Sequence, residues 1–174
     1  MGTLSGCLGK FANAINKAAR LIRKLERVQF EAAPHPVLGA PTLNVGTIRG
    51  GLNINSVPDR TVIGVDIRTV PGMQHAKIIE GVARCSDDAI RIVPLADMAS
   101  VATDPAHEWI QHVFEVVAAH TGQQALPQGA AYFTDAAALR SAGHPPPTVI
   151  LGPGEPTQAH QTDEFVMLPR IDEA

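Results

Sequence analysis

The chain has 174 residues, of which 45% are apolar, and a formal net charge of −3 at pH 7. This length can hold one ordinary domain or two small ones, and the apolar fraction excludes a disordered chain. Acidic and basic residues are mixed along the sequence, which predicts no nucleic-acid partner and no polybasic membrane patch. The two cysteines, Cys7 and Cys85, form neither a disulfide framework nor a CxxC metal pair. Because the sequence also has no signal-peptide pattern and no transmembrane run, we expect a cytoplasmic protein without a membrane partner.

Helices and strands alternate in the first half of the predicted fold. After a Gly-rich, aperiodic start, apolar residues at three- and four-residue spacing predict an amphipathic helix over about 10–28. Alternating segments at 42–49 and 60–69, separated by Gly, Asn and Pro residues, predict a β-hairpin. Asp66 and Arg68 share one face of the second of these strands. A helix over about 76–83 and a strand over 89–98 follow.

The predicted order α-β-β-α-β lacks one element of a common arrangement. A further strand at the start would complete the ferredoxin-like β-α-β-β-α-β unit, a two-layer sheet with both helices on one face. The first nine residues have no strand periodicity. We therefore predict an α/β (α+β) fold whose first domain lacks its first strand.

The composition of the sequence changes near Ser100, which predicts that a second domain begins there. Asp104 and Pro105 are typical of an N-cap and a first helical residue, and a helix with an apolar face follows them. Asp135 is placed to cap a short helix that begins at 136. The segment 147–150 is β-branched and indicates a buried strand, followed by a Gly/Pro loop. Ligands bind where strands of an open α/β sheet end, so this loop is a candidate site.

Histidines give two candidates for metal chemistry, of different quality. His107 and His112 resemble the HExxH zinc motif, but they stand five residues apart and point about 140° apart around a helix. We interpret them, with His120, as surface or helix-end residues. His160 follows the Gly/Pro loop and precedes two acidic residues. By its position alone, His160 is either a partly exposed loop residue or a metal ligand, a proton carrier or a hydrogen-bond donor.

Three groups of motifs, in a fixed order along the chain, carry a resemblance to a known family. They are 41–51 (PTLNVGTIRGG); 55–59 (NSVPD) with 66–68 (DIR); and 134–136 (TDA) with 152–154 (GPG), 159–160 (AH) and 163–164 (DE). Together they resemble the M20 metallopeptidase family of acetylornithine deacetylases, succinyl-diaminopimelate desuccinylases, aminoacylases and related carboxypeptidases. The ordered set covers nearly the whole chain from about Asn13 onward.

The resemblance implies a fold, a cofactor and a set of site residues. Enzymes of this family have an α/β catalytic domain with two zinc ions and an inserted ferredoxin-like lid, through which they form homodimers. On that basis residues 1–98 are the lid/dimerisation domain and 99–174 are the C-terminal portion of the catalytic domain. By motif, His160 matches a zinc ligand. Asn55 and Arg68 match lid residues that contact the substrate, and Thr134 and Gly154 match positions of substrate loops.

The implied roles agree with the chemistry of the side chains. An Arg fork binds a carboxylate in two places, an Asn amide donates to an oxyanion, and a neutral imidazole is an ordinary zinc ligand. The implied activity is zinc-dependent cleavage of the amide bond in N-acyl amino acids or small peptides.

The family's remaining machinery lies upstream of the lid, outside the present sequence. It comprises the other zinc ligands and the Glu that acts as general base, while a lid histidine that reaches across the dimer belongs to the first strand. Segment 2–6 contains no histidine. One ligand cannot hold two metal ions, so we assign no catalytic residue here and expect this chain alone to be inactive. The alternative is a non-enzymatic dimerisation or interaction module derived from the lid.

Overall fold

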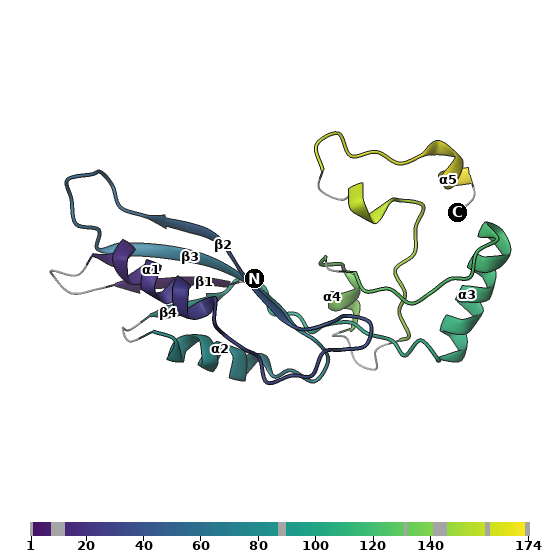
Figure 1. The fold of residues 1–174 in the computed structure, drawn as a ribbon, viewed down its shortest axis with the longest axis horizontal. Coiled ribbons are helices and arrows are strands. Elements are labelled where there is room, and N and C mark those ends of the chain that lie inside the picture. Colours follow the sequence, from purple (N-terminus) through teal and green to yellow (C-terminus); the bar gives the residue numbers. More distant parts are fainter. Residues whose placement is uncertain are drawn as a thin grey trace.

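The structure is a computed structural model that describes residues 2–7, 13–86, 90–130, 132–140, 146–158 and 161–172. Figure 1 shows two lobes, a sheet with helices in the first half of the chain and helices joined by long loops in the second half. Within the described ranges, no helix is long and apolar enough to cross a membrane.

The first lobe is a complete β-α-β-β-α-β unit. Its elements are β1 (Gly2–Cys7), α1 (Ala14–Leu25), β2 (Thr42–Gly50), β3 (Arg60–Arg68), α2 (His75–Arg84) and β4 (Arg91–Pro94). All paired strands are antiparallel, and the sheet order is β2-β3-β1-β4. This is the ferredoxin-like arrangement that the element order predicted.

The prediction that this lobe lacks its first strand is wrong. Strand β1 lies in the middle of the sheet, where Leu4 is opposite Ile63 of β3 on one side and Ile92 of β4 on the other. Its sequence, GTLSGC, has few of the β-branched and aromatic residues that mark strands, so no local pattern reveals it. Pairing on both sides, rather than propensity, makes this segment a strand.

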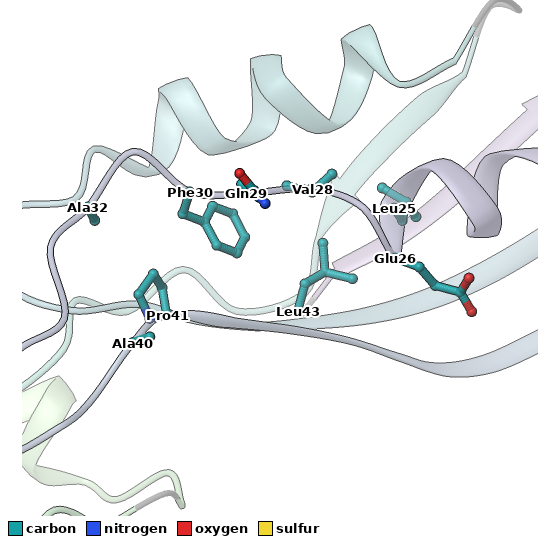
Figure 2. Close-up of a pocket in the computed structure, with 9 residues that line it drawn as sticks. All are labelled: Leu25, Glu26, Val28, Gln29, Phe30, Ala32, Ala40, Pro41 and Leu43. Atoms are coloured by element: carbon teal, nitrogen blue, oxygen red, sulfur yellow. The ribbon is translucent and has the colours of Figure 1, made fainter.

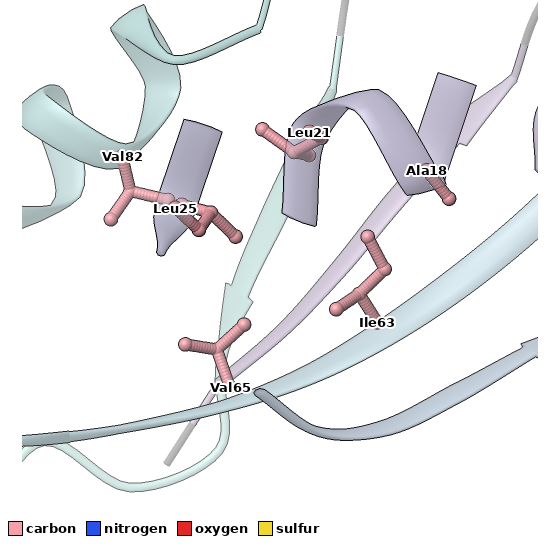
Figure 3. Packing of buried hydrophobic residues seen from close by; sticks show 6 residues of the cluster. All are labelled: Ala18, Leu21, Leu25, Ile63, Val65 and Val82. Carbon is pink, nitrogen blue, oxygen red and sulfur yellow. The ribbon is translucent and has the colours of Figure 1, made fainter. Parts of the chain in front are cut away.

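Helices α1 and α2 pack on one face of the sheet and enclose the core with it. The core cluster consists of Ala18, Leu21 and Leu25 of α1, Ile63 and Val65 of β3, and Val82 of α2, whose side chains point toward one another in Figure 3. Strand β3 alternates buried and partly exposed residues, as a strand covered on one face must. At its N-terminus α1 is capped by Asn13, whose side-chain oxygen accepts a hydrogen bond from the Asn16 amide at 3.0 Å.

The second half contains helices α3 (Glu108–Thr121), α4 (Ala136–Arg140) and α5 (Leu168–Asp172) and the 3₁₀ turn η1 (Pro156–Gln158). Helix α3 begins later than predicted. The Asp104 Oδ1 accepts from the Ala106 amide at 2.9 Å and so caps a separate turn before the helix. The N-cap of α3 is His107, whose Nδ1 accepts from the Trp109 amide at 3.1 Å. Helix α3 ends at Thr121, and its C-cap, Gly122, has the left-handed conformation that favours glycine.

The predicted buried strand at 147–150 does not form. Thr148 is held instead by Thr103, whose hydroxyl donates to the Thr148 carbonyl at 2.9 Å and accepts from its amide at 2.8 Å. A strand needs a neighbouring strand to pair with, and the described residues after Pro94 form none. The β-branched run therefore remains an extended segment, with Ile150 exposed.

Candidate functional site

Arg68 is the last residue of β3, and its side chain pairs with Asp66 on the same face of the strand. The Arg68 Nε donates to the Asp66 Oδ2 at 2.7 Å, and the two side chains are 45% and 25% exposed. This contact uses the inner nitrogen of the guanidinium. The edge formed by the two terminal nitrogens is the one that can bind a carboxylate in two places.

Asn55 lies in the loop between β2 and β3, at the opposite end of β3 from Arg68. Figure 1 shows this loop at the tip of the first lobe, far from the second. Strand β3 runs from Arg60 to Arg68, eight residue steps of about 3.4 Å, so it is roughly 27 Å long. A small substrate bound at Arg68 therefore cannot contact Asn55 of the same chain.

Thr134 and Gly154 lie in loops of the second lobe. Thr134 is partly buried two residues before the start of α4, and its carbonyl accepts from the Ala137 amide at 3.2 Å. Gly154 lies in an exposed bend before η1, and a Cβ there would meet no atom within 4 Å. Because its φ is not positive, the described fold does not itself require glycine at this position.

His160 lies outside the described residues, so its role as a metal ligand stays a prediction. Within the described part of the chain, no group of three or more His, Cys, Asp or Glu residues could hold a metal ion. The acidic residues after it, Asp163 and Glu164, are exposed. Zinc requires several converging donors, and the residues described do not by themselves fit a zinc site.

The three histidines near α3 lie where the sequence placed them, at a helix end or on the surface. His107 caps α3 with its ring nitrogen, and His112 has a side chain that is 72% exposed. The His112 Nδ1 lies 3.8 Å from the Glu115 Oε2, so the two rings have different partners.

Sequence reasoning missed a polar cluster beside Arg68, which we call the Thr69 cluster. His75, the first residue of α2, lies 3.3 Å from the Thr69 hydroxyl through Nε2 and pairs through Nδ1 with the Asp97 carboxylate. The cluster joins the end of β3, the start of α2 and the chain after β4. The three residues are separated by up to 28 positions, so no local motif could have identified it.

One shallow cavity of about 290 Å³ lies between the end of α1 and the start of β2. Figure 2 shows its lining, in which apolar side chains such as Phe30 and Leu43 face the hollow. None of the five predicted site residues lines this cavity. It is a feature of the first lobe's packing and not the predicted substrate site.

A comparison with protein families identifies the first lobe. Residues 4–93 match the family described as peptidase dimerisation domain. This range coincides with the β-α-β-β-α-β sheet from β1 to β4.

Curated relatives extend the similarity beyond that lobe. The chain is 31% identical over 160 residues to an acetylornithine deacetylase of Vibrio cholerae, covering 88% of this chain and 39% of that protein. It is 30% identical over 149 residues to the acetylornithine deacetylase of Klebsiella pneumoniae, covering 81% of this chain and 36% of that protein. The chain thus spans less than two fifths of the length of these curated relatives.

Solved structures share the fold. An M20 family metallo-carboxypeptidase from Sulfolobus solfataricus matches with a TM-score of 0.70 and 16% identity, over 99% of this chain and 54% of that one. A di-peptidase from Saccharomyces cerevisiae matches with a TM-score of 0.72 and 13% identity, over 99% of this chain and 50% of that one. At this identity the likeness concerns the fold alone.

Proposed function

The chain belongs to the M20 peptidase family, whose dimerisation domain it contains, and on that premise we propose that it is part of a zinc-dependent amidohydrolase. The proposed reaction is cleavage of the amide bond in N-acyl amino acids or small peptides. The observation that carries this proposal is the 160-residue similarity to an acetylornithine deacetylase, which runs well beyond the 4–93 range of the dimerisation domain. Both lobes are therefore related to one kind of hydrolase.

The proposed division of labour follows the two lobes. Residues 1–98 form the lid/dimerisation domain, and residues 99–174 form the C-terminal portion of the catalytic domain. The sheet in the first lobe and its absence among the described residues after Pro94 support this boundary. A free thiol at Cys85 agrees with a reducing compartment, so we keep the cytoplasm as the proposed location.

Substrate binding is assigned to Arg68, Asn55, Thr134 and Gly154. Arg68 binds the substrate carboxylate through its two terminal nitrogens, while Asp66 holds Nε and thereby orients the guanidinium. The length of β3, roughly 27 Å, separates Asn55 from this position. If both side chains contact one substrate, they come from different protomers, which supports a homodimer formed through the lid.

The metal part of the proposal rests on His160 alone. Its imidazole supplies one zinc donor, and two zinc ions of the family's site would need further ligands from outside the present sequence. The described residues do not fit a complete metal site, so we assign no catalytic step to this chain by itself.

A restoration assay tests the enzyme proposal. The chain is mixed with zinc and with the upstream, ligand-bearing portion of an acetylornithine deacetylase supplied as a separate polypeptide, and release of ornithine from N-acetylornithine is measured. We expect hydrolysis that requires both polypeptides. Arg68→Lys keeps the charge and loses the bidentate fork, so it should raise the KM for substrate roughly tenfold or more. No hydrolysis of any N-acyl amino acid by the wild-type mixture would refute the proposal.

A second candidate function is a non-enzymatic dimerisation or interaction module. It is favoured by the contrast between a complete lid sheet and the lack of a metal-binding group among the described residues. Zinc content after dialysis against micromolar zinc is compared for the chain, for His160→Ala and for His112→Ala as control. Stoichiometric zinc lost only in His160→Ala supports a metal site within this chain, whereas negligible zinc in all three is expected of a hydrolase fragment and of a module alike, which the restoration assay then separates. A stable monomer in sedimentation at micromolar concentration would contradict dimerisation in either reading.

A further inference from the structure

The connection between α1 and β2 contains a small closed turn at residues 35–39. The His35 amide donates to the Gly39 carbonyl at 2.8 Å, and the Gly39 amide donates back to the His35 carbonyl at 2.9 Å. Gly39 has a φ of 75°, a left-handed conformation that favours glycine. We call this segment the His35 turn.

The imidazole of His35 shapes the interior of the turn. Its Nδ1 accepts hydrogen bonds from the Val37 amide at 3.2 Å and from the Leu38 amide at 3.1 Å. A ring nitrogen that accepts carries no proton, so this arrangement places the proton of the neutral ring on Nε2. Two backbone donors are thus satisfied by one side chain.

The His35 turn touches the second lobe at a position where only glycine fits. A Cβ at position 129 would lie 2.6 Å from the Val37 carbonyl oxygen and 3.3 Å from the Leu38 Cα. The φ of Gly129 is not positive, so close packing against the turn, rather than backbone conformation, excludes a larger residue here. Figure 1 shows the α1–β2 connection extending from the first lobe toward the segment before α4.

The same turn lies between two predicted parts of the substrate site. Three residues after Gly39, Thr42 begins β2 and is the sheet partner of Arg68. On the other side, Gly129 precedes Thr134 by five positions in the loop that leads to α4. The turn therefore connects the strand end that carries Arg68 with the loop that carries Thr134.

Resting on the proposed amidohydrolase function, we propose that His35 is a positioning residue. By shaping the turn that docks on Gly129, it fixes the loop leading to Thr134 relative to the strand end that carries Arg68. His35 itself contacts neither of these predicted substrate-binding residues. Its effect passes through the Val37 carbonyl.

Amide hydrogen exchange on the full chain tests the docking. In His35→Ala we expect exchange to become roughly tenfold faster at the Val37 and Leu38 amides, which lose their acceptor. The backbone NMR shifts of 128–130 should move as well, because these residues lose their contact with the turn. His35→Asn should restore the protection of Val37 and the shifts of 128–130, because an Asn side-chain oxygen accepts from the amide two residues on. Rescue by Asn distinguishes positioning from general packing of the imidazole.

Gly129→Ala tests the same contact from the other side. It should accelerate exchange at the Val37 and Leu38 amides across the contact, and its combination with His35→Ala should add little at these amides, because both changes break one contact. Gly152→Ala is the matched control, since a Cβ there meets no atom within 4 Å. Unchanged shifts at 128–130 in His35→Ala, or equal effects of Gly129→Ala and Gly152→Ala at the Val37 and Leu38 amides, would overturn the proposal.

The exchange result is independent of catalysis. If the expected changes are found in His35→Ala but the restoration assay yields no hydrolysis, the proposed enzyme function is refuted. The contact of the His35 turn with Gly129 is then still supported. If hydrolysis is restored, His35→Ala should lower kcat/KM for N-acetylornithine roughly tenfold, and His35→Asn should recover it. Hydrolysis with no change in His35→Ala would overturn the positioning role.

Discussion

The two lobes differ in whether they enclose an apolar core. The lid has exposed apolar residues too, among them Leu52 and Ile54, but these lie in the β2–β3 loop, outside its core cluster. In the lid, the sheet and two helices enclose a cluster in which Leu25 is only 1% exposed. In the second lobe, the described residues bury Ile110 and Ala137, whereas large apolar side chains such as Leu126, Leu139 and Leu168 are 68%, 72% and 74% exposed. Exposed apolar surface of this kind marks an interaction site or an aggregation hazard. The lid carries its own core, and the second lobe depends on contacts beyond those described.

Separating the lobes should give the largest effect. We expect residues 1–98 alone to unfold cooperatively in urea, because four paired strands and two packed helices suffice for independent stability. Residues 99–174 alone should show no cooperative transition by circular dichroism. Cooperative unfolding of both pieces with undiminished helix content would contradict this contrast between the lobes.

Truncation of a core leucine should sharpen the contrast within the full chain. Leu25→Ala removes a fully buried side chain and should lower the free energy of unfolding by about 3 kcal/mol. Leu139→Ala, at an exposed position of α4, should change it by less than about 0.5 kcal/mol. Both are measured by urea titration of helix content. Equal losses for the two variants would mean that the second lobe has a core of its own.

A buried hydroxyl gives a stabilising change of intermediate size. Thr61 is buried in β3, and its Oγ1 has no hydrogen-bond partner among the described residues. Thr61→Val removes the unsatisfied oxygen and keeps a β-branched side chain, so it should raise the free energy of unfolding by about 1 kcal/mol. Thr42→Val, at the exposed start of β2, is a control that should have little effect. A loss of stability in Thr61→Val would indicate that the hydroxyl is satisfied, for example by water.

The smallest predicted effect concerns the cap of α1. Asn13→Ala removes the acceptor of the Asn16 amide and should lower the free energy of unfolding by about 0.5 to 1 kcal/mol. Asn13→Ser should retain most of the stability, because Ser is also a good N-cap residue. An effect of Asn13→Ala as large as that of Leu25→Ala would show that the side chain has a further role.

Periodicity predicted most of the lid and little of the second lobe. The hairpin expected at 42–49 and 60–69 is β2 and β3, and the helices expected at about 10–28 and 76–83 are α1 and α2. Each of these segments has one buried face, which leaves a local pattern. The sequence predicts no strand for β1 and a strand for 147–150, and both predictions are wrong. β1 is a strand because it pairs with β3 and β4, whereas segment 147–150 has no strand to pair with among the described residues.

The candidate site also has a part that the sequence predicts and a part that it does not. The shared face of Asp66 and Arg68 follows from strand alternation, and their ion pair confirms it. The motif-based roles of Asn55, Thr134, Gly154 and His160 stay predictions, and His160 is outside the described residues. No pattern in the sequence predicts the Thr69 cluster or the contact of the His35 turn with Gly129.

The sequence by itself indicated the family and five of the six elements of the ferredoxin-like unit, and its motifs assign the proposed roles to named residues, because motifs and periodicity are local properties of the chain. The tertiary structure decided that GTLSGC is a central strand, that roughly 27 Å of β3 separates Asn55 from Arg68, and that Gly129 meets the His35 turn. These features depend on pairing and packing between segments far apart in the chain, where the energy of a contact is set by the partner rather than by the residue alone.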